Sequence, residues 1–397
     1  MKQFVILVLL VIAFGSEYIR AATHKTPKHP LVLVPGITGS RLSISDPSKP
    51  GYKEEVIWVN LKYLLNIREL FDKLKLIYDP ISGEFVSNPK YVITVPGWGD
   101  IYTISILDSQ NRTFASYYYP LVKELMKDPF MVPNVTLRGA PYDFRIDPRT
   151  NKDFVPKLKQ LIEETYTRNG NRRVVLFAHS MGSIVAVRFL NAMTVEWKQK
   201  YIETFVTVNG ANGGTVKVLK ALLSGDNFGA IIIDPLLCRS IERTFTSIYT
   251  MLPDPRLFGP DKYLIRAPKA NYSAHDYKKL FHDIHHDIGY EIWRNTTMDM
   301  DTLSEPTGVD NMYCIYSSEL STTEELRYSK PTGSGASFPD QMPDLTFGDG
   351  DGTVNLQSLE FCKKWTNAKH VHILGKSHNG ILGSSKLHNL LWEILGQ

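Results

Sequence analysis

Short apolar runs alternate with amphipathic segments along most of this chain. Short apolar runs predict buried strands, and apolar residues that recur every three or four positions predict helices. Strands are expected at residues 31–34, 91–95, 135–140, 174–177, 201–208, 311–317 and 371–374, and helices at 117–126, 154–165, 184–190 and 387–395. This alternation predicts an α/β fold with a mostly parallel sheet and helices on both faces.

Two stretches interrupt the alternation. Residues 46–100 begin with a polar, turn-rich segment and continue with an amphipathic one, which rests either on a lipid surface or on its own domain. Residues 215–310 contain several prolines and are interpreted as a cap inserted over the carboxyl-terminal edge of the sheet. The polar segment 324–343 is predicted to be a loop. We therefore expect a single domain over residues 23–397 that carries an insertion at each of the first two stretches.

The amino terminus predicts entry into the secretory pathway. Its apolar run from Phe4 to Phe14 follows a lysine, is too short to span a bilayer, and is typical of a signal peptide cleaved between about residues 15 and 22. Residues 1–22 are thus expected to be removed, and the mature protein is expected outside the cell or in the lysosomal lumen. Four Asn-x-Ser/Thr sites predict N-glycosylation at Asn111, Asn134, Asn271 and Asn295.

Composition and charge exclude several classes of function. A hydrophobic content of 43% and a charged content of 22% are ordinary for a globular protein. The net charge of +4, without a cluster of Lys and Arg, argues against a nucleic-acid partner. No metal or other cofactor is expected, because the cysteines lack metal-ligand spacing and the histidines at 282, 285 and 286 are interpreted as a solvated helix face. The Gly-Asp-Gly-Asp-Gly segment at 348–352 lacks the remaining ligands of a calcium loop.

The stretch that predicts chemistry is Ala178-His179-Ser180-Met181-Gly182, which lies between a buried strand and an apolar helix. A strand, a tight turn and a helix with a serine at the apex form a nucleophile elbow, which lifts the serine oxygen clear of the sheet. The positive amino-terminal end of the helix favours negative charge near that oxygen. An ordinary Ser/Gly turn is the alternative interpretation, so the assignment depends on the partners that the chain supplies for Ser180.

The chain supplies those partners in the expected order. In a serine hydrolase of this architecture, the acid and then the histidine follow the nucleophile. His378 follows the last strand, and either Asp349 or Asp351 is the acid; Asp351 is favoured because it immediately precedes a turn. In this hypothesis Ser180 attacks an ester carbonyl, His378 transfers the proton, and Asp351 orients the imidazole.

Such a reaction also needs donors for the oxyanion. The first strand runs into Pro35-Gly36-Ile37, and backbone N–H groups in a turn at this place can form half of an oxyanion hole. We expect the backbone N–H groups of Met181 and Ile37 to be the two donors; for Ile37, a plain strand-to-loop turn is the alternative. The loss of one such donor costs about 2.7–4 kcal/mol of transition-state stabilisation.

The chain resembles the lecithin:cholesterol acyltransferase family, and most closely its lysosomal phospholipase A (group XV) branch. The matching segments keep the family's order over nearly the whole mature chain and lie at residues 31–41, 57–61, 138–145, 178–182, 224–227, 348–355 and 377–378. The resemblance implies an α/β-hydrolase fold and selects Asp351 over Asp349. The three cysteines could form any one of three disulfides. The resemblance implies a bond between Cys314 and Cys362 and leaves Cys238 free.

The resemblance also implies how the enzyme meets its substrate. It implies a small membrane-binding insertion near residues 50–80 and a lid loop near residues 224–234. Contacts with substrate or membrane are therefore expected from Trp58, Trp98, Ile231 and Ile232. The family's cysteine pair in the early insertion is missing here. Ile37 stands where the lysosomal branch has an aspartate, so no sharp acid optimum is expected from that position.

The function implied by the resemblance is that of a phospholipase A and lipid O-acyltransferase. An acyl group passes from a glycerophospholipid to Ser180, and from there to water or to a lipid alcohol such as a sterol or a ceramide-like acceptor. The expected partners are a phospholipid membrane or lipoprotein surface and the acceptor, and the enzyme is expected to be a monomer. The alternatives are a neutral-lipid or general carboxylesterase on the same fold and an inactive lipid-binding protein.

Overall fold

The fold is built around a six-stranded parallel sheet. The computed structural model describes residues 27–49, 51, 53–108, 115–147, 153–227, 233–297, 301–330 and 335–396. The strand order is β15-β12-β9-β8-β1-β7, and every neighbouring pair is parallel. The strands are β1 (Leu31–Val34), β7 (Leu137–Gly139), β8 (Val174–His179), β9 (Ile202–Val208), β12 (Asn311–Ser318) and β15 (Ala368–Leu374). The predicted α/β class with a mostly parallel sheet is confirmed.

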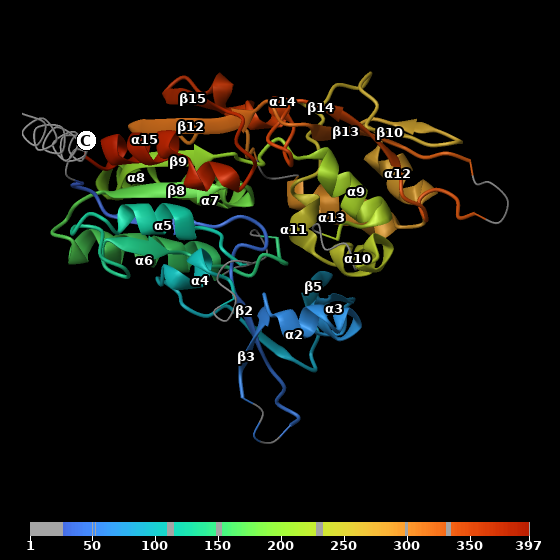
Figure 1. The fold of residues 1–397 in the computed structure, drawn as a ribbon, viewed down its shortest axis with the longest axis horizontal. Helices are drawn as coiled ribbons and strands as arrows, with labels where there is room; N and C mark the ends of the chain where they lie inside the picture. Colours follow the sequence, from blue (N-terminus) through green and yellow to red (C-terminus); the bar gives the residue numbers. More distant parts are fainter. Residues whose placement is uncertain are drawn as a thin grey trace, which may run out of the picture.

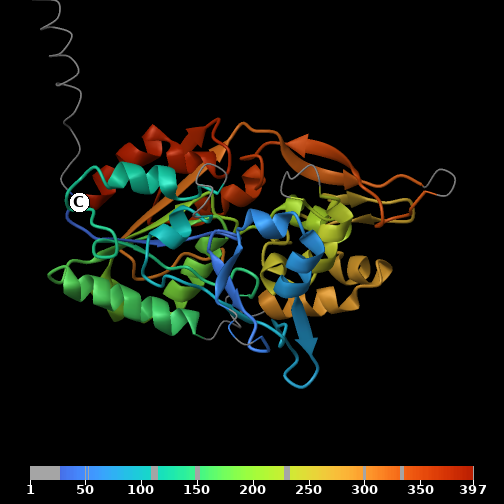
Figure 2. The same cartoon turned by 60° about the horizontal axis from the view of Figure 1, so that its bottom comes forward.

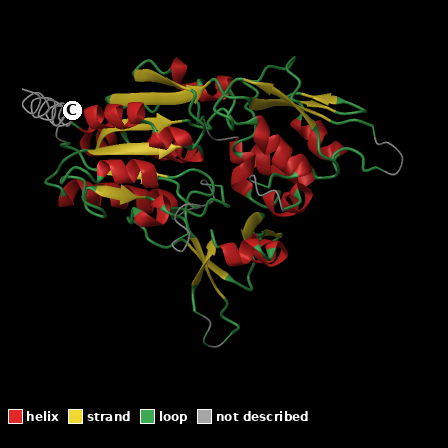
Figure 3. Ribbon diagram, viewed as in Figure 1, coloured by secondary structure: helices red, strands yellow, loops and turns green. Residues whose placement is uncertain are grey.

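Helices cover both faces of this sheet, as Figures 1 and 3 show. Alternate residues of a strand point to opposite faces, so Leu31 and Leu33 of β1 belong to one buried cluster and Val32 and Val34 to another. The first cluster includes residues of α4 (Tyr102–Ser105), α5 (Tyr119–Leu125) and α15 (Ser385–Leu395). The second includes residues of α6 (Phe154–Arg168) and α7 (Met181–Ala192), with Trp197 of α8 (Val195–Tyr201) packed against it. Burial on both faces explains why these strands are continuously apolar.

The cap consists of helices and a second, smaller sheet. Its helices are α9 (Val216–Ser224), α10 (Pro235–Glu242), α11 (Thr246–Tyr249), α12 (Tyr277–Asp283) and α13 (Asp287–Thr297). Its sheet has the order β11-β10-β13-β14, from β10 (Ile265–Arg266), β11 (Asn271–Tyr272), β13 (Thr322–Arg327) and β14 (Asp344–Gly348). In Figures 1 and 2 these elements lie beside the main sheet, beyond the ends of its strands.

The loop predicted at residues 324–343 is therefore partly wrong, because its first residues belong to β13. The sequence concealed this strand because its side chains are mostly polar. Glu325 is nevertheless buried, and its carboxylate pairs with Arg266 of β10 at 2.8 Å. At this position an ion pair, and not a contact between apolar side chains, joins the neighbouring strands. The hydrophobic pattern of the sequence therefore does not indicate the strand.

The histidines interpreted as one solvated helix face do not share an environment. His282 is exposed and pairs with Asp287 at 3.0 Å, whereas His286 is partly buried with its Nε2 2.8 Å from the hydroxyl of Tyr249. Burial, and then the nearby Arg243, lower the pKa of His286 to about 4. Within the described ranges, no group of three or more potential ligand side chains could hold a metal ion.

The early insertion projects from the hydrolase core and lies next to the cap (Figures 1 and 2). It contains the antiparallel sheet β3-β2-β6, made of β2 (Leu42–Ser45), β3 (Glu55–Trp58) and β6 (Val92–Thr94). Between β3 and β6 lie α2 (Leu61–Leu64), α3 (Ile67–Leu74) and the hairpin of β4 (Leu76–Asp79) and β5 (Glu84–Ser87). No helix in the part of the chain that the structure describes has the length and apolar character to cross a bilayer.

A fully buried arginine fastens this insertion to the core. Arg145 follows β7, and its guanidinium binds the Asp143 carboxylate with two hydrogen bonds of 2.9 and 2.6 Å. The same guanidinium donates to the carbonyl oxygen of Leu74, at the end of α3, and to the hydroxyl of Ser87, at the end of β5, both at 2.9 Å. The end of the helix α3 and the end of the hairpin are thus tied to one core side chain.

We expect Arg145→Met to lower the free energy of unfolding by about 3–5 kcal/mol, because the variant leaves Asp143 without its charge partner in a nearly buried place. Urea-induced unfolding followed by circular dichroism measures the change. Arg256→Met is the control, since Arg256 is half exposed and pairs with Asp254 and Asp301 on the surface. We expect that variant to change stability by less than about 1 kcal/mol. Equal losses in the two variants would contradict the anchoring role of Arg145.

Candidate active site

The predicted nucleophile lies on a strained turn. Ser180 separates β8 from α7, and its φ of 59° with ψ of −130° is a backbone conformation that side-chain-bearing residues rarely adopt. The turn packs directly on the end of β1. A Cβ atom on Gly36 would lie 2.8 Å from the Cβ of Ser180, and one on Gly182 would lie 2.5 Å from the carbonyl oxygen of Val34. Both glycines are therefore needed for this close approach.

Three predicted side chains meet at this turn. The Oγ of Ser180 lies 2.8 Å from Nε2 of His378, and Nδ1 of His378 lies 2.6 Å from Oδ2 of Asp351. Asp351 is fully buried, and its Oδ1 accepts the backbone N–H groups of Thr353 and Val354 at 2.9 and 2.8 Å. These two hydrogen bonds fix the carboxylate so that its other oxygen faces the imidazole.

The other candidate acid has a different task. Asp349 accepts the backbone N–H groups of Glu319 and Gly350, at 2.6 and 2.7 Å, through one carboxylate oxygen. It therefore holds the loop after β12 against the loop that precedes Asp351. The geometry thus distinguishes the roles of the two aspartates, whereas their positions in the sequence only favoured Asp351 as the acid.

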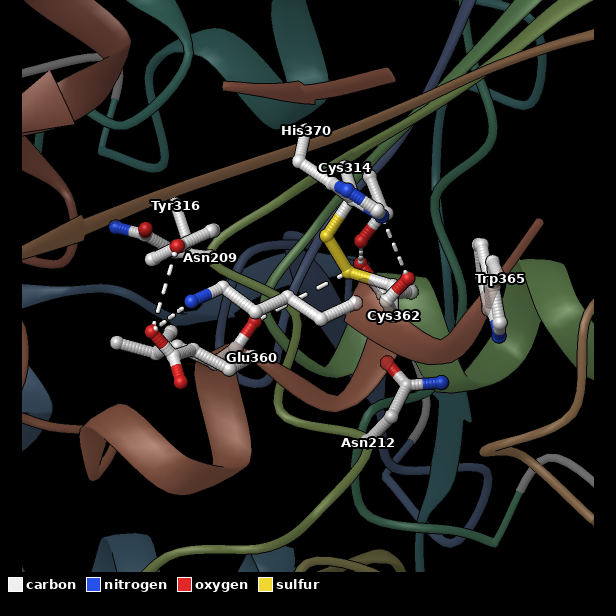
Figure 4. The surroundings of a disulfide bond; sticks show 12 residues. Asn209, Asn212, Cys314, Tyr316, Glu360, Cys362, Trp365 and His370 are labelled. Atoms are coloured by element: carbon white, nitrogen blue, oxygen red, sulfur yellow. Dashed lines mark hydrogen bonds and ion pairs between the residues drawn. A yellow bond between two sulfur atoms is a disulfide. The ribbon is translucent and has the colours of Figure 1, made fainter. Parts of the chain in front are cut away.

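A disulfide lies behind the loop of Asp351. Cys314 of β12 is bonded to Cys362, with their Cα atoms 6.1 Å apart, and Cys238 is free and buried. Cys362 lies in the short helix η1 (Phe361–Lys364), which follows α14 (Leu356–Leu359) and the Asp351 turn. Figure 4 shows the bond, with His370 donating to the carbonyl oxygen of Cys362 at 2.9 Å. The pairing implied by the family resemblance is thus present, and it ties the acid loop to the central sheet.

The two predicted oxyanion donors come from the residue after Ser180 and from the loop after β1. Met181 is the first residue of α7, and Ile37 follows Gly36 on the loop after β1. Among the described residues, no hydrogen bond uses the backbone N–H of Ile37 or of Met181. Both groups therefore remain available to a ligand oxygen, as an oxyanion hole requires.

The loop after β1 is held by residues that the sequence pattern did not single out. Three buried tyrosines bind three successive residues of the chain. Tyr118 donates to the carbonyl oxygen of Val34 at 2.9 Å, and Tyr142 donates to that of Pro35 at 2.8 Å. Gly36 donates its N–H to the hydroxyl of Tyr117 at 2.9 Å. The run of tyrosines at 117–119 could have drawn attention to Tyr117 and Tyr118, and Tyr142 lies in the segment 138–145 that the family resemblance matched.

The remaining predicted residues lie in varied places. Trp58 donates its indole N–H to the carbonyl oxygen of Thr38 at 2.9 Å, so it supports the same loop. Trp98 packs edge-on against Phe154, with ring centroids 5.8 Å apart. Three of the predicted glycosylation sites are exposed, namely Asn134, Asn271 and Asn295. The predicted signal peptide at residues 1–22 and the predicted residues Asn111, Ile231 and Ile232 lie outside the described residues.

Comparisons with known proteins agree on one family. The model of the family described as lecithin:cholesterol acyltransferase matches residues 52–305 and 295–392. The lysosomal phospholipase A and acyltransferase of Homo sapiens is 33% identical over 405 residues, which cover 98% of this chain and 95% of that protein. The phosphatidylcholine-sterol acyltransferase of Gallus gallus is 33% identical over 368 residues, which cover 88% of this chain and 85% of that protein.

A solved structure supports the fold alone. A chain of the Tle4–Tli4 complex superimposes with a TM-score of 0.55 at 11% identity and covers 94% of this chain and 98% of that one. This superposition, together with the parallel sheet and the strained turn between β8 and α7 of this chain, confirms the expected α/β-hydrolase fold.

We expect Gly36→Ala to lower Ser180-dependent hydrolysis of a soluble short-chain ester by about 10²–10³-fold, because the added methyl group displaces the loop that carries Ile37. Initial rates per folded protein measure the effect. Gly259→Ala is the matched control, since a Cβ at Gly259 meets no atom within 4 Å. A Gly36→Ala enzyme as active as the Gly259→Ala enzyme would show that this close approach does not matter for catalysis.

Proposed function

Because this chain belongs to the lecithin:cholesterol acyltransferase family, we propose that it is a phospholipase A and lipid O-acyltransferase that works through Ser180. The observation that carries the mechanism is the unbroken hydrogen-bonded series Ser180–His378–Asp351 on a strained turn. The related proteins named above are a phospholipase and acyltransferase and a phosphatidylcholine-sterol acyltransferase. Together they support a glycerophospholipid as the acyl donor.

The proposed acylation step follows from the geometry. His378, with Nε2 2.8 Å from the serine Oγ, takes the hydroxyl proton while that oxygen attacks the ester carbonyl. The carbonyl oxygen becomes an oxyanion, which the N–H groups of Ile37 and Met181 stabilise. His378 then gives the proton to the departing lysophospholipid alcohol as the ester bond breaks. Asp351 holds the imidazole in the required tautomer and stabilises its cation.

Deacylation repeats these steps with a second alcohol or with water. His378 removes a proton from the acceptor oxygen, which attacks the acyl-Ser180 carbonyl, and the same proton returns to the serine when the acyl–serine bond breaks. Hydrolysis releases a fatty acid, whereas attack by a lipid alcohol forms a new ester. The acceptor thus decides whether the enzyme acts as a phospholipase or as a transferase.

The early insertion is proposed to rest on a phospholipid membrane or lipoprotein surface. Leu65, between α2 and α3, and Ile81, in the turn between β4 and β5, expose 83% and 96% of their surface. Further exposed apolar side chains of the hairpin are Ile77, Tyr78 and Val86. The same insertion carries Lys62, which pairs with Glu55, and Lys75, which pairs with Asp72, and both lysines are exposed enough to meet a surface that carries phosphate groups. Exposed apolar clusters of this kind mark contact surfaces on proteins.

The proposal includes a compartment in the secretory pathway, either lysosomal or extracellular. The apolar leader and the exposed sequons support it, and one relative is named as lysosomal. A general carboxylesterase on the same fold remains the second candidate, because the Ser180 geometry alone would serve any ester.

We expect Ser180→Ala to abolish product formation from liposomal phosphatidylcholine, by at least about 10⁴-fold, because the nucleophile is lost. The assay measures free fatty acid and acyl ester in the presence of cholesterol or a short-chain ceramide, at about pH 4.5 and about pH 7.4. Because Ile37 carries no titratable group, we expect no sharp acid optimum to arise from that position. Ser180-dependent cleavage of short-chain esters, with no product from liposomes at either pH, would favour the carboxylesterase.

We expect the double variant Leu65→Ser/Ile81→Ser to lower the rate on liposomes at least about tenfold while it keeps the rate on a soluble short-chain ester, since only the liposome reaction needs lipid contact. Co-sedimentation with vesicles measures binding directly. Val132→Ser, which changes an exposed apolar residue on the hydrolase core, is the control. Unchanged vesicle binding in the double variant would refute this role of the insertion.

A further inference from the structure

A buried histidine next to the nucleophile takes no part in the proposed mechanism. His179 is the last residue of β8 and is fully buried. Its Nδ1 lies 2.7 Å from the hydroxyl oxygen of Tyr117, and its Nε2 lies 2.9 Å from the backbone carbonyl oxygen of His378. Tyr117 in turn accepts the backbone N–H of Gly36 at 2.9 Å. The side chains of Tyr117 and His179 therefore connect the loop after β1 with the loop after β15.

The direction of each hydrogen bond in this series follows from the chemistry. A carbonyl oxygen can only accept, so Nε2 of His179 carries the proton that it donates to His378. The unprotonated Nδ1 must then accept the proton of the Tyr117 hydroxyl, whose oxygen accepts from Gly36. Burial and then the neighbouring His378 hold the pKa of His179 well below its usual value, and burial raises the pKa of Tyr117. Both side chains accordingly stay neutral near neutral pH.

The two loops that this series connects are far apart in the sheet. The strand order places β8, β9 and β12 between β1 and β15. Gly36 immediately precedes Ile37, the proposed oxyanion donor, and the carbonyl group at the other end belongs to His378 itself. That carbonyl also accepts from Asn209 Nδ2 at 3.1 Å, while Asn209 Oδ1 accepts the N–H of Ser317 at 2.8 Å. Its position is thus fixed from the middle of the sheet as well.

We propose that Tyr117 and His179 are positioning residues that hold the oxyanion loop and the His378 loop in register around Ser180. The assignment rests on the proposed function, since it supposes that Ile37 and His378 serve the same acyl transfer. Catalytic groups must be held within about 0.5 Å of their productive arrangement, and residues that support them provide this precision. A misplacement of about 1 Å can cost about 10²-fold in rate.

The first test removes one hydroxyl group. Tyr117→Phe leaves the N–H of Gly36 without an acceptor and Nδ1 of His179 without a donor, so we expect kcat to fall about 10- to 100-fold with KM changed less than about twofold. Titration with a fluorophosphonate counts the competent Ser180 sites, so that kcat refers to folded enzyme. A merely structural tyrosine would change the amount of folded protein and leave kcat per site unaltered.

The cap offers a matched control. Tyr249 is also buried, donates to the carbonyl oxygen of Arg243 at 2.9 Å, and has its hydroxyl oxygen 2.8 Å from Nε2 of His286. Tyr249→Phe therefore also removes one hydrogen bond to a backbone group and one to a histidine, and it does so in the cap. We expect it to change kcat per site less than about twofold. Equal losses of kcat in the two variants would overturn the positioning role of Tyr117.

The second test separates the roles of the two ring nitrogens of His179. The amide of glutamine reaches about as far as Nε2, so His179→Gln keeps a donor to the His378 carbonyl. The amide of asparagine reaches about as far as Nδ1, so His179→Asn keeps an acceptor for Tyr117 and loses the bond to His378. We expect the kcat of His179→Gln to be at least about tenfold higher than that of His179→Asn. We also expect His179→Gln to keep the downfield proton resonance of the His378–Asp351 hydrogen bond, and His179→Asn to lose or shift it.

These outcomes decide the proposal even if Tyr117→Phe does not fold, because the two His179 variants test the same series independently. A His179→Asn enzyme as active as His179→Gln, with an unchanged resonance, would overturn it. The failure of the proposed function looks different. In that case the wild-type protein itself gives no Ser180-dependent product from any ester, whereas here the wild type is active and only the comparison among variants fails.

Discussion

The close approach between the end of β1 and the turn at Ser180 is the constraint on which the rest of the site depends. The positive φ of Ser180 raises its hydroxyl above the sheet, and this conformation exists only because Gly36 and Gly182 let two backbones touch. The contact places Gly36, which immediately precedes Ile37, directly against Ser180. Strain at one residue is thus held by packing on both sides of it, which is a common arrangement at catalytic sites.

The sheet and the elbow could be predicted because they follow from local patterns. Strands such as β8 are continuously apolar, and the turn at Ser180 combines small residues with a serine at a recognisable spacing. The choice between Asp349 and Asp351 could not be made from spacing alone, since both lie in one glycine-rich turn. It depends on which backbone N–H groups each carboxylate accepts, and these are set by the tertiary fold.

Other features of the structure could not be predicted from the sequence, for physical reasons. The strand β13 is stabilised by an ion pair between Glu325 and Arg266 and contains one aliphatic residue, Leu326, so its apolar pattern is weak. Arg145 lies in a segment that the family resemblance matched, but the sequence does not show that it is fully buried or that two of its partners come from the insertion. The segment of Arg145 also contacts the cap, where Asp147 donates its N–H to Thr246 at 2.8 Å. Contacts between residues so far apart along the chain produce no periodic pattern in the sequence.

The disulfide has a consequence for how the protein must be made. Cys314 and Cys362 are 48 residues apart, and the chain between them contains β13, β14 and Asp351. Closing a loop of that length removes about 4 kcal/mol of chain entropy from the unfolded state. In a reducing cytoplasm the disulfide does not form, so the protein loses this stabilisation in the segment that contains Asp351. The chain is therefore suited to expression hosts that export it through an oxidising compartment.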